Sequence, residues 1–188
     1  MGRFSKIPET TFDELQVDAG VLLKGFNPAE PTLDNANIIC ATTGGINPVC
    51  TPTFADWGAD IDNCPENTKE LKEITGYTCS LGFTALTVTA ETIRMALGAA
   101  DIEAETGKIT PRHELEDEDF ADVWWVGDIS DGGFAAICLK NALSTGGFSL
   151  QTTKAGKGQV SVTLTGHYSI EAQDDVPMEF YVIKGNEA

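Results

Sequence analysis

The chain has 188 residues and a formal net charge of −17, from 29 acidic and 12 basic residues. This balance excludes a protein that wraps nucleic acid, because phosphate binding needs clustered Lys and Arg, and it disfavours binding to anionic membranes. Hydrophobic residues make up 41% of the chain, and threonine, serine and 19 glycines are abundant. That composition is typical of an all-β protein. We find no run of about 18 apolar residues and no secretory pattern, so we expect a cytosolic translation product.

The N-terminal half predicts four strands. Apolar patterning places them at 15–23, 37–43, 49–57 and 74–88, with Gly44-Gly45 ending the second. Closely spaced prolines predict a long loop at 24–36, and a polar stretch predicts another at 56–73. The longest strand alternates strictly, so we expect one apolar face and one face of small polar residues. Its apolar positions are Tyr77, Cys79, Leu81 and Phe83.

One short helix follows. Thr89 is a suitable N-cap, Glu91 lies in the first turn, and Gly98 is a suitable stop. Ile93 and Leu97 are four residues apart, which predicts that they share the buried face.

The C-terminal half predicts further strands at 101–108, 123–128, 134–139, 148–153, 159–170 and 178–183. In the strand at 159–170, Val160, Val162, Leu164, Gly166, Tyr168 and Ile170 form the expected apolar face. We expect one domain over 1–188 with a flexible N-terminal arm at 1–14. The fold class is all-β with about nine strands and one short helix, arranged as a β-sandwich or open barrel.

The residues that could carry chemistry form no recognisable motif. Phosphate-binding glycine loops and a nucleophile elbow are missing from the sequence, and the spacing of the five cysteines fits no zinc pattern. A zinc site that uses His113 or His167 stays open as an alternative. We therefore predict no catalytic, cofactor or metal site and interpret the chain as not an enzyme.

An acidic run spans residues 114–122. The favoured interpretation is a solvated, self-repelling loop outside the main sheet. A calcium site and a pair of hydrolytic carboxylates are the alternatives, although the spacing and central glycine of an EF-hand are missing.

The second face of the long strands carries Thr, Ser, Gly and Gln but few charges. A monomer normally protects its wet faces and strand edges with charged residues. This pattern favours a sheet that continues into neighbouring subunits.

Three segments carry a family resemblance: ITPRHELEDEDFADVWWVGD, then DGGFAAICLKNALSTGGFSLQTTKAGKGQVSVTLTGHYSI, then AQDDVPMEFYVI. Upstream, ATTGGI and TAETIRMALGA extend it. In order and wording, residues 36–183 resemble the major tail tube proteins of long-tailed bacteriophages, whose fold also serves type VI secretion tubes.

The resemblance implies a structural virion protein of the phage tail, assembled in the cytoplasm of the bacterial host. Six subunits of that family form a ring, the rings stack into a hollow tube, and their sheets join into one inner barrel through which DNA passes. Its partners would be further copies of itself and the tape measure, tail terminator and tail tip proteins, without membrane contact. The residues that we expect to face the lumen are Asp128, Asp131, Gln159, Ser161, Thr163, Asp174 and Asp175.

Two other functions compete with this one. An acidic β-sandwich could bind carbohydrate or another ligand through Trp124-Trp125, although adjacent strand residues point to opposite faces. A hydrolase that uses the acidic run is the second. Concentration-dependent assembly separates the tube protein from both.

Overall fold

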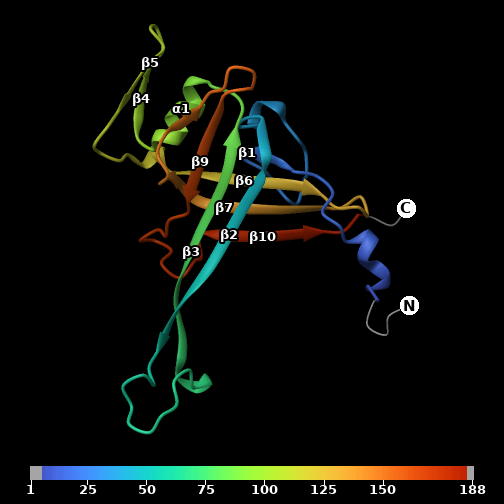
Figure 1. Ribbon diagram of the computed structural model, residues 1–188, viewed down its shortest axis with the longest axis vertical. Helices are drawn as coiled ribbons and strands as arrows, with labels where there is room; N and C mark the ends of the chain where they lie inside the picture. Colours follow the sequence, from blue (N-terminus) through green and yellow to red (C-terminus); the bar gives the residue numbers. More distant parts are fainter. Residues whose placement is uncertain (1–5, 186–188) are drawn as a thin grey trace.

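The computed structural model describes residues 6–185 of the chain. This part contains ten strands and one α-helix (Figure 1). Eight of the strands form one large antiparallel sheet that does not close into a barrel. Its main order is β1 (Val21–Leu23), β6 (Ala121–Asp128), β7 (Phe134–Ser144), β9 (Gln159–Thr165), β3 (Lys72–Ala85) and β2 (Thr42–Asp56). Two further strands pair off this path, β10 (Met178–Ile183) with β7 and β8 (Ser149–Gln151) with β9. The prediction of an all-β fold with one short helix is confirmed.

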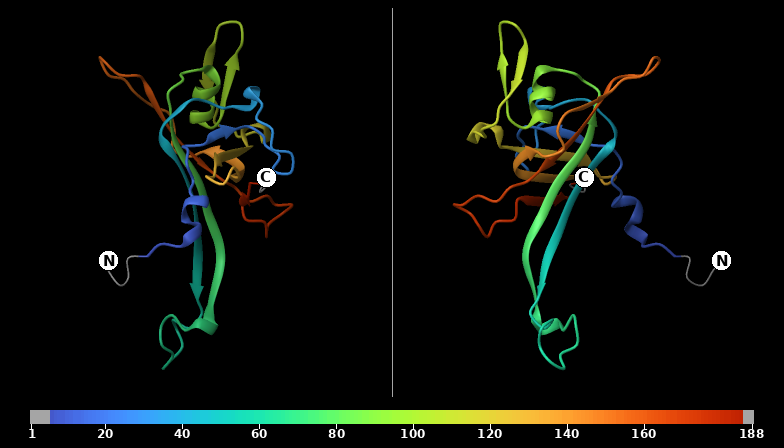
Figure 2. Two further views of the ribbon diagram at one scale, coloured as in Figure 1. Left: turned by 90° about the vertical axis from the view of Figure 1, so that its right-hand side faces the viewer. Right: turned by 60° about the vertical axis from the view of Figure 1, so that its left-hand side comes forward.

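The sheet bends so that its two halves pack like the layers of a sandwich. In Figures 1 and 2, β2, β3 and β9 cross over β6, β7 and β10. The end of β7 bridges the halves, where Leu143 and Ser144 pair with β9. The core lies between the layers, with Leu81 and Leu164 from one and Leu139 from the other fully buried.

β2 is one strand of 15 residues, where the sequence predicted two. Gly44 and Gly45 have φ angles of 76° and 85°, and the register with β3 jumps from Thr43 to Ile46. The two glycines therefore form a bulge inside the strand and do not end it. The first predicted strand is wrong over 15–20, because only Val21–Leu23 pairs with β6.

The hairpin of β2 and β3 projects far beyond the rest of the molecule (Figure 1). Its tip is the predicted loop at 56–73, which contains a 3₁₀ turn at Lys69–Leu71. The other predicted long loop, 24–36, connects β1 to a 3₁₀ turn at Asn35–Asn37. The predicted N-terminal arm contains a 3₁₀ turn at Glu9–Asp13, and its first five residues lie outside the described part.

Helix α1 (Ala90–Leu97) begins and ends as predicted, but it buries a different face. The Thr89 side chain accepts a hydrogen bond from the Thr92 amide, and Gly98 ends the helix at φ 84°. The buried residues are Thr92 and Ala96, so the prediction of Ile93 and Leu97 is wrong. Small Ala96 allows close approach to β7, whose Ser144 hydroxyl donates to the Ala96 carbonyl at 2.8 Å.

The predicted strand at 101–108 is a separate hairpin, β4 (Ala100–Glu103) and β5 (Lys108–Pro111). β9 is shorter than predicted and ends at Thr165. At Gly166 the chain turns from β3 toward β7, so closely that a Cβ would lie 2.8 Å from the Pro177 carbonyl oxygen. Tyr168 and Ile170, predicted on the apolar face, are therefore exposed.

Candidate assembly surface

One face of the β8–β9–β3–β2 layer is built from small uncharged side chains. The register places Asn47, Gly82 and Thr163 side by side, and Val49, Ser80 and Thr165 in the next row. We name this surface the polar face. It consists of Thr43, Asn47, Val49, Thr51 and Thr53 of β2, Thr78, Ser80, Gly82 and Thr84 of β3, Ser149 and Gln151 of β8, and Gln159, Ser161, Thr163 and Thr165 of β9.

None of these side chains is charged, although 22% of the chain's residues are. The opposite side of β3 and β9 belongs to the buried core, because side chains alternate along a strand. A wet face would normally carry Lys and Glu, which keep exposed sheets apart. The polar face lacks that protection, so it resembles a surface that borders an enclosed space or another subunit.

The structure brings together three of the seven residues that we expected in a lumen. Gln159, Ser161 and Thr163 are exposed on the polar face. Asp128 and Asp131 lie at the turn between β6 and β7. Asp131 accepts a hydrogen bond from the Gly133 amide at 2.7 Å and thereby shapes this turn.

Asp174 and Asp175 lie at the other end of the same layer. They precede Met178, which pairs with Leu139, whereas Ile183 pairs with Phe134 beside the β6–β7 turn. The intervening β10 strand is about 17 Å long at 3.3 Å per residue. The four aspartates therefore form two separate pairs, and neither belongs to the polar face.

The tip of the projecting hairpin exposes large apolar side chains. Phe54 and Trp57 are 52% and 63% exposed, and Ile61 and Ile74 are similarly open. We name these four residues the tip cluster. Sequence reasoning missed the cluster because the loop is polar overall; Trp57 and Ile61 among acidic and amide residues were the available signal.

The tip is held in shape by Asp56. Its carboxylate accepts hydrogen bonds from the amides of Asn67 at 2.9 Å and Gly58 at 3.1 Å. The bond from the Asn67 amide is the largest cause of a lowered pKa of Asp56, and the bond from the Gly58 amide is the second. Asp56 therefore stays ionised in the folded hairpin. The Trp57 indole is fixed by a 2.7 Å hydrogen bond to Glu73. The tip cluster therefore belongs to a turn that is held by hydrogen bonds.

The free edge of β2 lacks two backbone donors. The carbonyl of Cys79 accepts from Gly166 at 3.0 Å, so it points away from β2. Cys50 opposite therefore belongs to a non-hydrogen-bonded pair, and Pro48 and Pro52, two residues away on either side, share its orientation. Their nitrogens face the open edge and carry no hydrogen. A neighbouring strand cannot form an unbroken ladder along this edge.

The acidic run is more ordered than a solvated loop. The Asp119 side chain is completely buried and accepts two hydrogen bonds from Arg112, at 2.8 and 3.0 Å. Asp119 also accepts from the Glu116 amide, and Glu116 forms an ion pair with Arg112 at 3.0 Å. The prediction of a solvated loop is wrong for Asp119, because its side chain is buried against Arg112. Within residues 6–185, no three or more His, Cys, Asp or Glu side chains are grouped to hold a metal ion.

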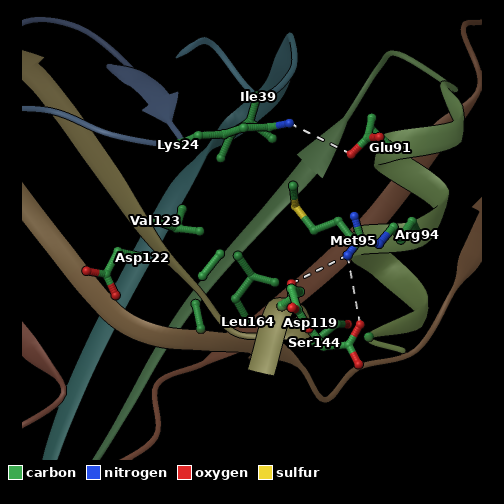
Figure 3. Close-up of a pocket in the computed structure, with 14 residues that line it drawn as sticks. Lys24, Ile39, Glu91, Arg94, Met95, Asp119, Asp122, Val123, Ser144 and Leu164 are labelled. Atoms are coloured by element: carbon green, nitrogen blue, oxygen red, sulfur yellow. Dashed lines mark hydrogen bonds and ion pairs between the residues drawn. The ribbon is translucent and has the colours of Figure 1, made fainter. Parts of the chain in front are cut away.

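A cavity of about 170 Å³ lies between α1 and the sheet (Figure 3). Two ion pairs line it, Lys24 with Glu91 at 3.8 Å and Arg94 with Asp119 at 3.9 Å. Ser144 also lines it, but its hydroxyl is engaged with the Ala96 carbonyl. Lys24, Glu91, Arg94 and Asp119 are thus paired with one another, and Asp122, which also lines the cavity, accepts a hydrogen bond from the Asn141 amide at 3.0 Å.

The two tryptophans proposed to bind carbohydrate, Trp124 and Trp125, are half-buried and contact other parts of the chain. The Trp124 ring lies 5.8 Å from Phe26 and 5.7 Å from Tyr181, measured between ring centroids. The Trp125 indole donates to the Ala19 carbonyl at 3.0 Å. His167 forms a hydrogen bond within the chain, with its Nδ1 3.1 Å from the Asn141 carbonyl oxygen.

Comparison with protein families finds no family model that matches the chain, and comparison with curated proteins finds no match. Within the part of the chain described, no helix combines the length and apolar character needed to cross a membrane.

Proposed function

We propose that this chain is a tail tube subunit of a long-tailed bacteriophage. Its copies assemble into rings, with six subunits in each, and the rings stack into a hollow tube that carries DNA. The polar face lines the channel, and the tip cluster contacts a neighbouring subunit. The tube binds DNA at no specific site and needs no cofactor.

The polar face is the observation that carries this proposal. Double-stranded DNA carries one negative charge per about 1.7 Å of its axis, and Lys or Arg side chains bind it by replacing counterions. A wall of Thr, Ser, Asn and Gln offers hydrogen bonds to water but no cation to a phosphate. DNA would therefore slide along such a wall without being held.

The projecting hairpin supports the assembly part of the proposal. A two-stranded hairpin is at best marginally stable alone in water, and four large apolar side chains at its tip make exposure unfavourable. Contact with an adjacent subunit would cover the tip cluster. The resemblance of residues 36–183 to tail tube proteins points in the same direction.

The free edge of β2 limits how the sheets of neighbouring subunits could join into an inner barrel. Because Pro48 and Pro52 remove two donors, we expect the sheets of neighbouring subunits to join here through side chains and a few backbone bonds. A continuous hydrogen-bonded barrel across this edge is not what the sequence of β2 supports.

Sedimentation velocity with a tip variant tests the proposal. The wild-type chain should form species far larger than its 20.0 kDa monomer as concentration and salt rise, because salt screens the −17 charge of each subunit. Phe54→Ser with Trp57→Ser should remain monomeric, because it removes the apolar contact. Its circular dichroism should match wild type, since both side chains lie outside the core.

Leu115→Ser is the matched control. Leu115 is 56% exposed in the acidic run, far along the chain from the hairpin, and its loss should leave assembly intact. A wild-type chain that stays monomeric at every concentration and salt would contradict the proposal. Such a result would favour the ligand-binding module, whose binding does not depend on self-association.

A further inference from the structure

Two cysteines face each other where the projecting hairpin leaves the body. Cys50 of β2 and Cys79 of β3 are directly paired, and their sulfur atoms are 3.2 Å apart. Cys79 is the first buried residue of β3 counted from the tip. The pair therefore lies at the root of the hairpin, between the core and the freely projecting part.

The backbone geometry at this pair suits a disulfide bond. Since the Cys79 carbonyl points toward β9, the pair is non-hydrogen-bonded with respect to β2. Opposed residues of this kind have Cα atoms about 4.5 Å apart and side chains close together. That separation lies within the range of about 4.4–6.8 Å found for disulfides. The two sulfurs, now 3.2 Å apart, would have to approach by about 1.2 Å to reach bonding distance.

The two thiols differ in reactivity. Burial raises the pKa of Cys79 well above that of an ordinary thiol, and the hydrogen bond with Cys50 adds to this effect. Cys79 therefore stays protonated near neutral pH. Cys50 is half-buried and more accessible, so it is the thiol that a reagent meets first.

We propose that Cys50 and Cys79 form a redox pair, which a small-molecule disulfide oxidises to a cross-strand disulfide that locks the root of the hairpin. The Cys50 thiolate attacks the reagent, forming a mixed disulfide and expelling one thiolate. The Cys79 sulfur then attacks the Cys50 sulfur, and the second reagent thiolate leaves and takes up the proton that Cys79 gives up. Two protein thiols are oxidised, and one reagent disulfide is reduced to two thiols. This inference is independent of the tube proposal.

Thiol counting after treatment with oxidised glutathione tests the pair. Cys50 and Cys79 should both lose their free thiols, with the loss of two hydrogens and with no glutathionyl group left on either residue. Amide exchange in the hairpin strands beside the pair should slow on oxidation, and dithiothreitol should reverse both changes.

Variants separate the two steps. Cys79→Ala should retain one glutathionyl group on Cys50, whereas Cys50→Ala should lose no thiol to a disulfide. Cys64→Ala is the matched control, since Cys64 is also half-buried but lies outside the pair, and it should still lose two thiols. The proposal is overturned if wild type keeps five thiols, if Cys50 accumulates the mixed disulfide, or if Cys50→Ala still forms an intrachain disulfide.

Discussion

Glu179 on β10 shows how single residues stabilise the outer layer. It pairs with Lys140 on the neighbouring β7 and accepts a 2.7 Å hydrogen bond from the Tyr181 hydroxyl. The Lys140 contact is the larger cause and the Tyr181 bond the second, and together they lower the pKa of Glu179. A carboxyl whose pKa is lower in the folded state binds protons more readily when unfolded. Its contribution to stability is therefore present above the unfolded pKa of 4.5 and is lost as pH falls through the folded value.

The prediction concerns acid unfolding of Glu179→Gln. Between about pH 7 and about pH 3, the free energy of unfolding should fall less in the variant than in wild type. Both side chains of the ion pair are partly exposed, so the difference should be about 1 kcal/mol or less. Urea titrations at several pH values measure it. Parallel pH profiles would show that the Glu179 carboxylate contributes nothing to folding.

The sequence predicted some single-residue roles correctly and missed others. The Thr89 cap and the Gly98 stop of α1 depend on neighbouring residues only, and both were predictable. The burial of Asp119 was not, because its partner Arg112 comes from the end of another element. The opposition of Cys50 and Cys79 was equally hidden, since a sequence does not give strand register.

Among the elements, β9 separates its two faces most cleanly. Val160, Val162 and Leu164 are buried, whereas Gln159, Ser161 and Thr163 are exposed. We expect Leu164→Ala to lower the free energy of unfolding by about 2–5 kcal/mol, because it leaves a cavity beside Leu81. Thr163→Ala is the matched change on the polar face and should cost well under 1 kcal/mol in the monomer.

Urea unfolding of the monomer, at a concentration below assembly, measures both variants. Similar losses for Leu164→Ala and Thr163→Ala would mean that the polar face is also packed within the single chain. The interpretation of that face as a channel lining would then be wrong.

The positions of most strands were predicted from local patterns, whereas bulges and strand ends set by long-range contacts were not. β10 has the bounds that the sequence predicted. β2 was divided in two because Gly44-Gly45 is usually a turn, whereas pairing with β3 makes it a bulge. β9 was extended past Gly166 because the alternation continues, although the close approach of Pro177 ends the strand. The sequence showed a polar face on each strand, but only the register shows that these faces form one surface.

For the whole molecule, the net charge opposes self-assembly, and two surfaces favour it. A net charge of −17 drives subunits apart, whereas the uncharged polar face and the tip cluster favour contact. Screening shortens the reach of charge repulsion from about 8 Å at physiological salt to about 3 Å at 1 M. Assembly should therefore be favoured by high salt, which is the opposite of the behaviour expected for a nucleic-acid-binding protein.

Negative-stain electron microscopy of concentrated protein at high salt tests the central claim most directly. The account predicts rings or tubes with a stain-filled channel, and their loss in the Phe54→Ser, Trp57→Ser variant. Uniform particles of monomer size, or aggregates without a channel, would contradict the claim that this chain builds a hollow tube.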